Sequence, residues 1–135
     1  MKILAVDYGA VRTGLALSDI LGSLASPLCV ITQRNFEKLT DEIAGMAQAH
    51  NAEQIIVGLP LNMDGSHGES AQKCALLAGR LREKTNRPVH LVDERNTTKS
   101  AALYLNDTNT RGQKRKNLID AAAAAVLLQS YLDTI

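Results

Sequence analysis

Acidic residues occupy three places in this sequence where a carboxylate needs a partner. Asp7 ends the apolar run Ile3–Val6, the pair Asp93–Glu94 ends the run Val89–Val92, and Asp120 stands near the start of an alanine-rich segment. A carboxylate at the end of an apolar strand is costly to bury unless a cation or hydrogen-bond donors accompany it. Carboxylate oxygens are the ligands that Mg²⁺ and Mn²⁺ prefer. The three places together predict a divalent-metal site.

Such a site would suit phosphodiester hydrolysis, because two ions about 4 Å apart can activate a water and stabilise the leaving oxygen. Each acid also has a simpler explanation: Asp7 could start an Asx turn into Gly9, and Asp120 could interact with a helix dipole. Successive side chains of a strand face opposite sides, so only one of Asp93 and Glu94 can share a face with Asp7. The residues alone leave that choice open.

The elements that must position these acids follow from hydrophobic periodicity and turn residues. The pattern predicts two strands of a hairpin, a third strand, and then helices alternating with strands, with Asn35 as the N-cap of the first helix. The predicted strands are 3–6, 13–17, 28–32, 55–57 and 89–92, and the predicted helices are 36–47, 71–83, 97–105 and 118–132. Residues 106–116 are polar and are predicted to form a loop.

This order predicts an α/β fold with a mixed five-stranded sheet, in which three antiparallel strands precede the parallel ones. Helices are expected on both faces of the sheet. A length of 135 residues predicts one domain, spanning residues 1–135.

The charge is unevenly distributed along the chain. Residues 80–116 hold ten basic and four acidic side chains, a net charge of +6, whereas the rest carries −5 and the total is +1. A local excess of this kind favours a polyanionic partner over a mere solvated surface. Aromatic residues make up only 3% of the chain, which argues against a base-stacking platform. No apolar run approaches the ~20 residues of a membrane span, and no signal-peptide pattern opens the chain, so we expect a cytoplasmic protein.

Two predicted loops could contact such a partner. The basic loop, with Arg111, Lys114, Arg115 and Lys116, leads into the helix of Asp120 and is predicted to clamp nucleic acid. The turn at Gly58 and Pro60 is followed by Asn62 and Asp64, which are predicted to line a substrate groove unless the loop only shapes the turn.

Four blocks of residues resemble the YqgF (RuvX) family, in the right order and over essentially the whole chain. They are Asp7-Tyr8-Gly9 with Arg12-Thr13-Gly14-Leu15-Ala16, Gly58-Leu59-Pro60-Leu61-Asn62-Met63-Asp64-Gly65, Asp93-Glu94-Arg95, and Asp120-Ala121-Ala122-Ala123-Ala124 with Leu128-Gln129-Ser130-Tyr131-Leu132. The resemblance implies an RNase H-like fold and a nuclease whose catalytic and metal-binding acids fall on Asp7, Glu94 and Asp120. The oxygen ligands of the acids predict Mg²⁺ or Mn²⁺ as cofactor. Arg12 is predicted to contact nucleic acid, and Arg95 to hold a phosphate or to orient Glu94.

The expected activity is therefore a metal-dependent endonuclease acting on structured RNA, with 5′-end maturation of the precursor of 16S rRNA as its role. A resolvase of Holliday junctions in branched DNA is the alternative within the same chemistry, and an RNA-binding ribosome-assembly factor without catalysis is the alternative of another class. Sugar kinases and actin-like ATPases share the Asp-x-Gly pattern but need two such domains. We expect a monomer or weak homodimer, because the most apolar helix is required to cover the sheet.

Overall fold

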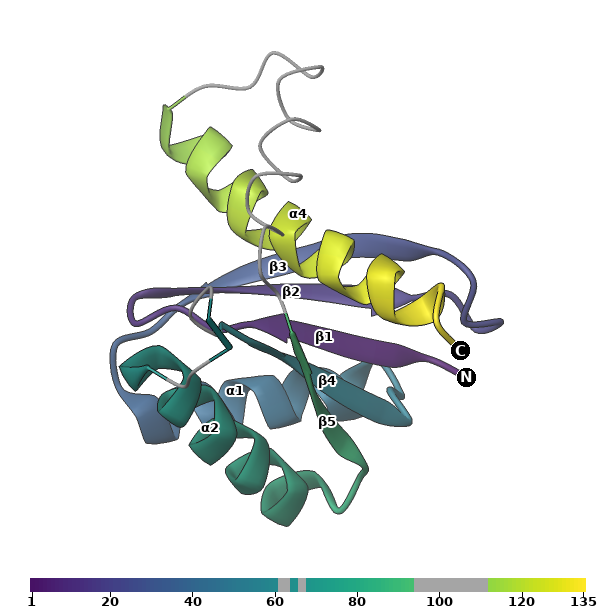
Figure 1. Ribbon diagram of the computed structural model, residues 1–135, viewed down its shortest axis with the longest axis horizontal. Helices are drawn as coiled ribbons and strands as arrows, with labels where there is room; N and C mark the ends of the chain where they lie inside the picture. Colours follow the sequence, from purple (N-terminus) through teal and green to yellow (C-terminus); the bar gives the residue numbers. More distant parts are fainter. Residues whose placement is uncertain (61–63, 66–67, 94–111) are drawn as a thin grey trace.

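The computed structural model describes residues 1–60, 64–65, 68–93 and 112–135, with side chains in the last stretch from residue 120 onward. Five strands form one sheet in the order β3-β2-β1-β4-β5 (Figure 1). The strands are β1 (Ile3–Asp7), β2 (Arg12–Ser18), β3 (Ala25–Thr32), β4 (Gln54–Leu59) and β5 (Val89–Asp93), and the helices are α1 (Phe36–Ala49), α2 (Glu69–Thr85) and α4 (Gly112–Leu132).

The pairing confirms the predicted mixed sheet. β1 pairs antiparallel with β2, and β2 with β3, whereas β1 and β5 run parallel to β4 on its two sides. Pro27 lies within β3, which is an edge strand, and proline is tolerated there because its missing N–H costs no ladder bond on the open side. Parallel strands end at the same edge, so β1, β4 and β5 all finish on one side of the sheet.

Helices cover both faces of the sheet, as predicted (Figure 1). Helices α1 and α2 pack on one face, where Leu4 and Val6 of β1 join a cluster of buried side chains. Helix α4 lies across the other face, where Ile3 and Ala5 of β1 are buried. The alternation of β1 therefore assigns its odd-numbered residues to the face of α4.

Helix α1 begins where the sequence predicts, because the side chain of Asn35 accepts a hydrogen bond from the backbone N–H of Lys38 at 2.9 Å. Helix α2 extends two residues beyond its predicted range at each end. Its last turn ends at Asn86, which adopts a left-handed conformation with φ 55°. Asparagine tolerates that region better than most residues, so the turn into β5 is locally encoded.

Two predictions about the loops are wrong. Residues 112–116 are helical, so Lys114, Arg115 and Lys116 belong to α4 and not to a loop. Lysine, arginine and glutamine are good helix formers, and their lack of apolar periodicity does not prevent a helix. Gly58 is a buried residue of β4 and not a loop residue, because β5 pairs with it through Val92 and extends the strand. The predicted helix 97–105 lies outside the described residues.

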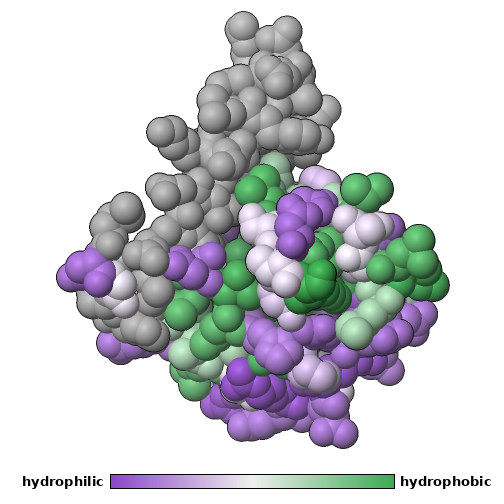
Figure 2. Space-filling view, turned by 45° about the vertical axis from the view of Figure 1, so that its right-hand side comes forward, coloured by the Kyte–Doolittle hydropathy of each residue, from purple (hydrophilic) through white to green (hydrophobic). Residues whose placement is uncertain are grey.

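Exposed apolar side chains gather at the end of the sheet away from Asp7. Ile20, Leu21 and Leu24 of the turn between β2 and β3 are more than half exposed, as are Met1 and Ile135 at the chain ends. Figure 2 shows hydrophobic surface on this side of the molecule. In the part of the chain that is described, no helix is long and apolar enough to cross a membrane.

Candidate functional site

The candidate site lies at the edge where β1, β4 and β5 end. Asp7 is the last residue of β1 and pairs with Gly14 of β2. On its other side, Val6 pairs with Val57, so Gly58 comes next to Asp7 at the same edge, and Gly58 pairs in turn with Val92. Two of the strands that meet at Asp7 thus present a glycine beside it.

Asp120 approaches this edge from the other end of the sequence. It is partly exposed and stands in α4, eight residues after Gly112. That is more than two helical turns from the start of the helix, so the helix-dipole explanation of Asp120 is wrong. Asp7 shares its side of β1 with Ile3 and Ala5, which face α4. Both carboxylates therefore belong to the same face of the sheet.

Gly14 connects the two acids. A Cβ atom at Gly14 would lie 2.0 Å from the backbone oxygen of Asp120, so α4 rests directly on the glycine. Residues directly opposite in an antiparallel pair have Cα atoms roughly 4.5–5.5 Å apart, and Asp7 is the residue opposite Gly14. The backbones of Asp7 and Asp120 thus approach each other on either side of Gly14, on the face of the sheet that α4 covers.

Arg12 completes this side of the site. Its Nε–H donates to Oδ2 of Asp120 at 2.8 Å, and the side chains of Arg12 and Asp120 are 34% and 27% exposed. Arg12 begins β2 and faces the same side as Gly14, so the ion pair joins β2 to α4 beside Asp7. The arginine was predicted to contact nucleic acid, and the structure gives it a protein partner in addition.

The turn between β1 and β2 is held by one buried threonine. The hydroxyl of Thr13 donates to the carbonyl of Gly9 at 3.2 Å and accepts the N–H of Gly9 at 3.3 Å. A Cβ at Gly9 would lie 2.1 Å from the backbone oxygen of Arg12, so only glycine fits this turn. Asp7 therefore stands at the end of a rigid hairpin.

A cavity of about 170 Å³ lies beside that turn, on the side of α2. It is lined by Tyr8, Gly9, Ala10, Glu69, Ser70 and Lys73. The ammonium of Lys73 sits over the ring of Phe36, 5.2 Å from its centre, and forms no ion pair with a described carboxylate. Burial, and to a lesser degree the neighbouring Cys74, raises the pKa of the Tyr8 hydroxyl, which therefore stays protonated at neutral pH.

The remaining predicted residues divide into three groups. Asp93 follows the alternation of Val89 and Leu91, which pack toward α1 and α2, and so belongs to the face opposite Asp7. Pro60 directly follows β4, and Asp64 is exposed in a turn. The helix backbone of Lys114, Arg115 and Lys116 is described but their side chains are not, and Asn62, Glu94, Arg95 and Arg111 lie outside the described residues.

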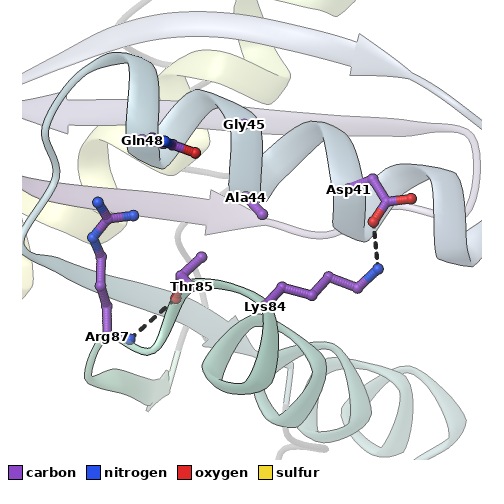
Figure 3. A pocket seen from close by; sticks show the side chains of 7 residues that line it. All are labelled: Asp41, Ala44, Gly45, Gln48, Lys84, Thr85 and Arg87. Atoms are coloured by element: carbon purple, nitrogen blue, oxygen red, sulfur yellow. Dashed lines mark hydrogen bonds and ion pairs between the residues drawn. The ribbon is translucent and has the colours of Figure 1, made fainter.

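A larger cavity, of about 580 Å³, lies between α1 and α2 on the far side of the sheet from Asp120. Figure 3 shows the ammonium of Lys84 directed at Asp41, with Thr85 accepting the backbone N–H of Arg87. Lys84 also pairs with Glu37 at 3.5 Å. The hydrogen bond that Lys84 donates to Asp41 raises the pKa of the lysine most, and attraction to both carboxylates raises it further. Lys84 is therefore paired with two carboxylates on this face of the sheet.

Residues 1–134 match the family described as RuvX: Holliday junction resolvase. This chain belongs to the RuvX family. A protein of Syntrophus aciditrophicus named "Putative pre-16S rRNA nuclease" is 37% identical over 135 residues, which is 100% of this chain and 90% of that protein. A protein of the same name from Halothermothrix orenii is 39% identical over 133 residues, covering 98% and 95% of the two chains.

The fold of this RuvX-family chain is RNase H-like. The structure of RuvC from Thermus thermophilus aligns with it with a TM-score of 0.62, 16% identity, and coverage of 99% of this chain and 98% of that one. The predictions of the family and of the fold are thus confirmed.

Sequence reasoning missed two features of the site. The pairing of Arg12 with Asp120 joins residues 108 positions apart, and no local pattern signals it. Lys73 was assigned no role, although its place four residues into α2, the helix that follows the Gly-Leu-Pro block, could have suggested a position near the same edge.

Proposed function

We propose that this chain is a divalent-metal-dependent endonuclease that cuts structured RNA, and that its substrate is the 5′-extended precursor of 16S rRNA. The observation that carries the proposal is the convergence of Asp7 and Asp120 on one face of the sheet edge, across Gly14. The names of the related proteins from S. aciditrophicus and H. orenii support the choice of RNA.

The residues at this edge fit a divalent cation. Asp7 and Asp120 supply hard oxygen donors on the same face of the sheet. No set of three possible ligands occurs within the described residues, and we assign the third position to Glu94. Strand alternation supports Glu94 over Asp93 as the third ligand, because Asp93 belongs to the face of the sheet opposite Asp7. A bound Mg²⁺ or Mn²⁺ would supply charge stabilisation at the phosphate and a more acidic water.

The chain's own residues bind and orient the substrate. Lys73 offers an ammonium on one side of Asp7, and Arg12 offers a guanidinium on the other. We assign further phosphate contacts to Arg95, Arg111, Lys114, Arg115 and Lys116, because local positive charge strengthens binding to nucleic acid. Pro60, Asn62 and Asp64 are proposed to line the groove, with buried Gly58 at its base. The rigid Gly9–Thr13 turn keeps Asp7 in place while the strand is bound.

The whole chain is proposed to act as one nuclease domain in the cytoplasm, where ribosomal precursors are processed. We propose a monomer or weak dimer, because a single cut in one strand needs one site.

The description of the RuvX family supports a second candidate, the resolution of four-way DNA junctions. That reaction requires two symmetric nicks, and so a stable dimer with two sites. The test is to incubate the purified protein with labelled 5′-extended rRNA precursor or with a four-way DNA junction, in Mg²⁺, Mn²⁺ or EDTA, and to measure its mass in solution. We expect faster cleavage of the RNA, none in EDTA, and no stable dimer. Symmetric nicking of the junction by a stable dimer, with intact RNA, would favour the resolvase.

A further inference from the structure

We propose that Arg12 is a phosphate-binding residue that Asp120 masks, so that the grip of Arg12 on RNA becomes available only when the charge of Asp120 is taken up by a metal ion. The inference rests on the proposed function, since it assigns RNA and a metal to this edge. It adds a link between the two: loading of the metal would strengthen binding of the substrate.

The geometry of the pair supports masking. Nε of Arg12 donates to Asp120 at 2.8 Å, and no other hydrogen bond or ion pair links the guanidinium to a described residue. The Arg12 side chain is 34% exposed, so part of it remains accessible at the sheet edge. The terminal nitrogens therefore remain as donors at the sheet edge, close to Asp7.

Electrostatics explains why the pair would act as a mask. Opposite charges in direct contact attract each other, and partial burial of the pair reduces screening by solvent. A phosphate that approaches Arg12 meets the Asp120 carboxylate as well, and the two anions repel each other. A metal ion on Asp120 would cancel that repulsion and weaken the hold of the carboxylate on Arg12.

The position of Arg12 in the fold makes the coupling between metal and RNA binding specific to this arginine. Arg12 lies at the first residue of β2, and Gly14, two residues later on the same face, touches the backbone of Asp120. Strand β2 thus fixes Arg12 relative to Asp120, because Arg12 and Gly14 share one face of that strand and Gly14 contacts Asp120. Reorientation of a single side chain, with no movement of the backbone, is enough to pass the guanidinium from carboxylate to phosphate.

A double-mutant cycle in EDTA tests the mask without metal and without cleavage. The affinity for a single-stranded rRNA-precursor fragment is measured for wild type, R12Q, D120N and R12Q/D120N over a range of salt, with urea unfolding to confirm that each variant is folded. We expect D120N to tighten binding and to steepen the dependence of log affinity on log salt by about 0.7, the slope of one added phosphate contact. In the R12Q background the same D120N change should leave the slope unchanged. Equal effects in both backgrounds would overturn the proposal.

The ion pair of Lys84 and Asp41 on the opposite face is the matched control, and its cycle should show no coupling. If D120N proves unstable, the affinity of R12Q for Mn²⁺ provides a second test, because R12Q retains Asp120. We expect R12Q to bind Mn²⁺ more tightly than wild type, and equal or weaker binding would refute the mask. If the wild-type protein cleaves RNA but the effects of R12Q and D120N are additive, only this inference is refuted. If the wild-type protein neither binds nor cleaves RNA, the proposed function is refuted too.

Discussion

Replacing Gly14 with alanine should separate α4 from β2 at the site. The new Cβ would lie 2.0 Å from the Asp120 oxygen and 2.4 Å from its carbonyl carbon, whereas real Cβ atoms essentially never approach a heavy atom within 3.0 Å. The helix or the strand must therefore shift by at least 1.0 Å, the difference between 3.0 and 2.0 Å. Both contacting atoms belong to backbone, so no side-chain rotation can relieve the clash.

The cost follows from what the shift disturbs. Buried alanines Ala121–Ala124 directly follow Asp120 in the part of α4 that packs on the sheet, and lifting the helix would open that interface. Overpacking of this kind costs roughly 1–3 kcal/mol, and we expect about 3 kcal/mol because the clash involves backbone on both sides. That is a large fraction of the 5–15 kcal/mol of a typical domain, roughly a third. Asp120 should also move, so cleavage should fall at temperatures where the variant is still folded.

Urea unfolding followed by circular dichroism measures this cost, and Gly45→Ala is the matched control. A Cβ at Gly45 would meet no atom within 4 Å, and the residue lies within α1. Alanine there should stabilise the protein by roughly 0.5–1 kcal/mol, because it favours the helix over the unfolded chain. If G14A unfolds at the same urea concentration as wild type and cuts RNA at the same rate, then α4 does not rest on Gly14 and the site geometry described above is wrong.

Three further variants test RNA binding by Lys73, the N-cap of α1 and the turn between β2 and β3. Lys73→Gln should flatten the dependence of log RNA affinity on log salt by about 0.7, while Lys2→Gln, at the opposite end of β1, should leave it unchanged; equal slopes for the two would remove Lys73 from the binding surface. Asn35→Ala should cost about 1 kcal/mol in urea unfolding, because it removes the N-cap of α1, and a neutral result would argue against the cap. Asp19→Asn should destabilise the turn between β2 and β3, because Asp19 accepts backbone N–H groups there and its pKa is lowered below 3.8. The difference in the free energy of unfolding between wild type and Asp19→Asn should be greatest above about pH 4 and should decrease as the pH falls through the lowered pKa. A difference that persists in acid would contradict this prediction.

The sequence was sufficient for the parts of this protein that repeat a local rule. The alternation of β1, the N-cap at Asn35 and the apolar face of α1 each follow from neighbours in the chain. The convergence of Asp7 and Asp120 could be proposed because both end or interrupt apolar segments, where a carboxylate is conspicuous.

Other features depend on tertiary contacts that no local pattern encodes. Gly58 continues β4 because β5 pairs with it, although Gly-Leu-Pro alone reads as a turn. Residues 112–116 are helical without an apolar face that would signal it, since their helix propensity is sufficient. The partner of Arg12 is 108 residues away, so no local pattern predicts its pairing with Asp120.

We propose that Asp7 acts directly at the cleavage site and that Asp93 does not. The decisive measurement is the Mg²⁺-dependent rate of cleavage of the 5′-extended rRNA precursor by Asp7→Asn and Asp93→Asn, two variants with the same chemical change at the ends of parallel-oriented strands β1 and β5. Urea unfolding and RNA affinity in EDTA serve to show that both variants remain folded and bind RNA. We expect cleavage by Asp7→Asn to fall to the rate that wild type shows in EDTA, and cleavage by Asp93→Asn to stay close to the wild-type rate. Cleavage by Asp7→Asn at the wild-type rate, or loss of cleavage in Asp93→Asn alone, would contradict it.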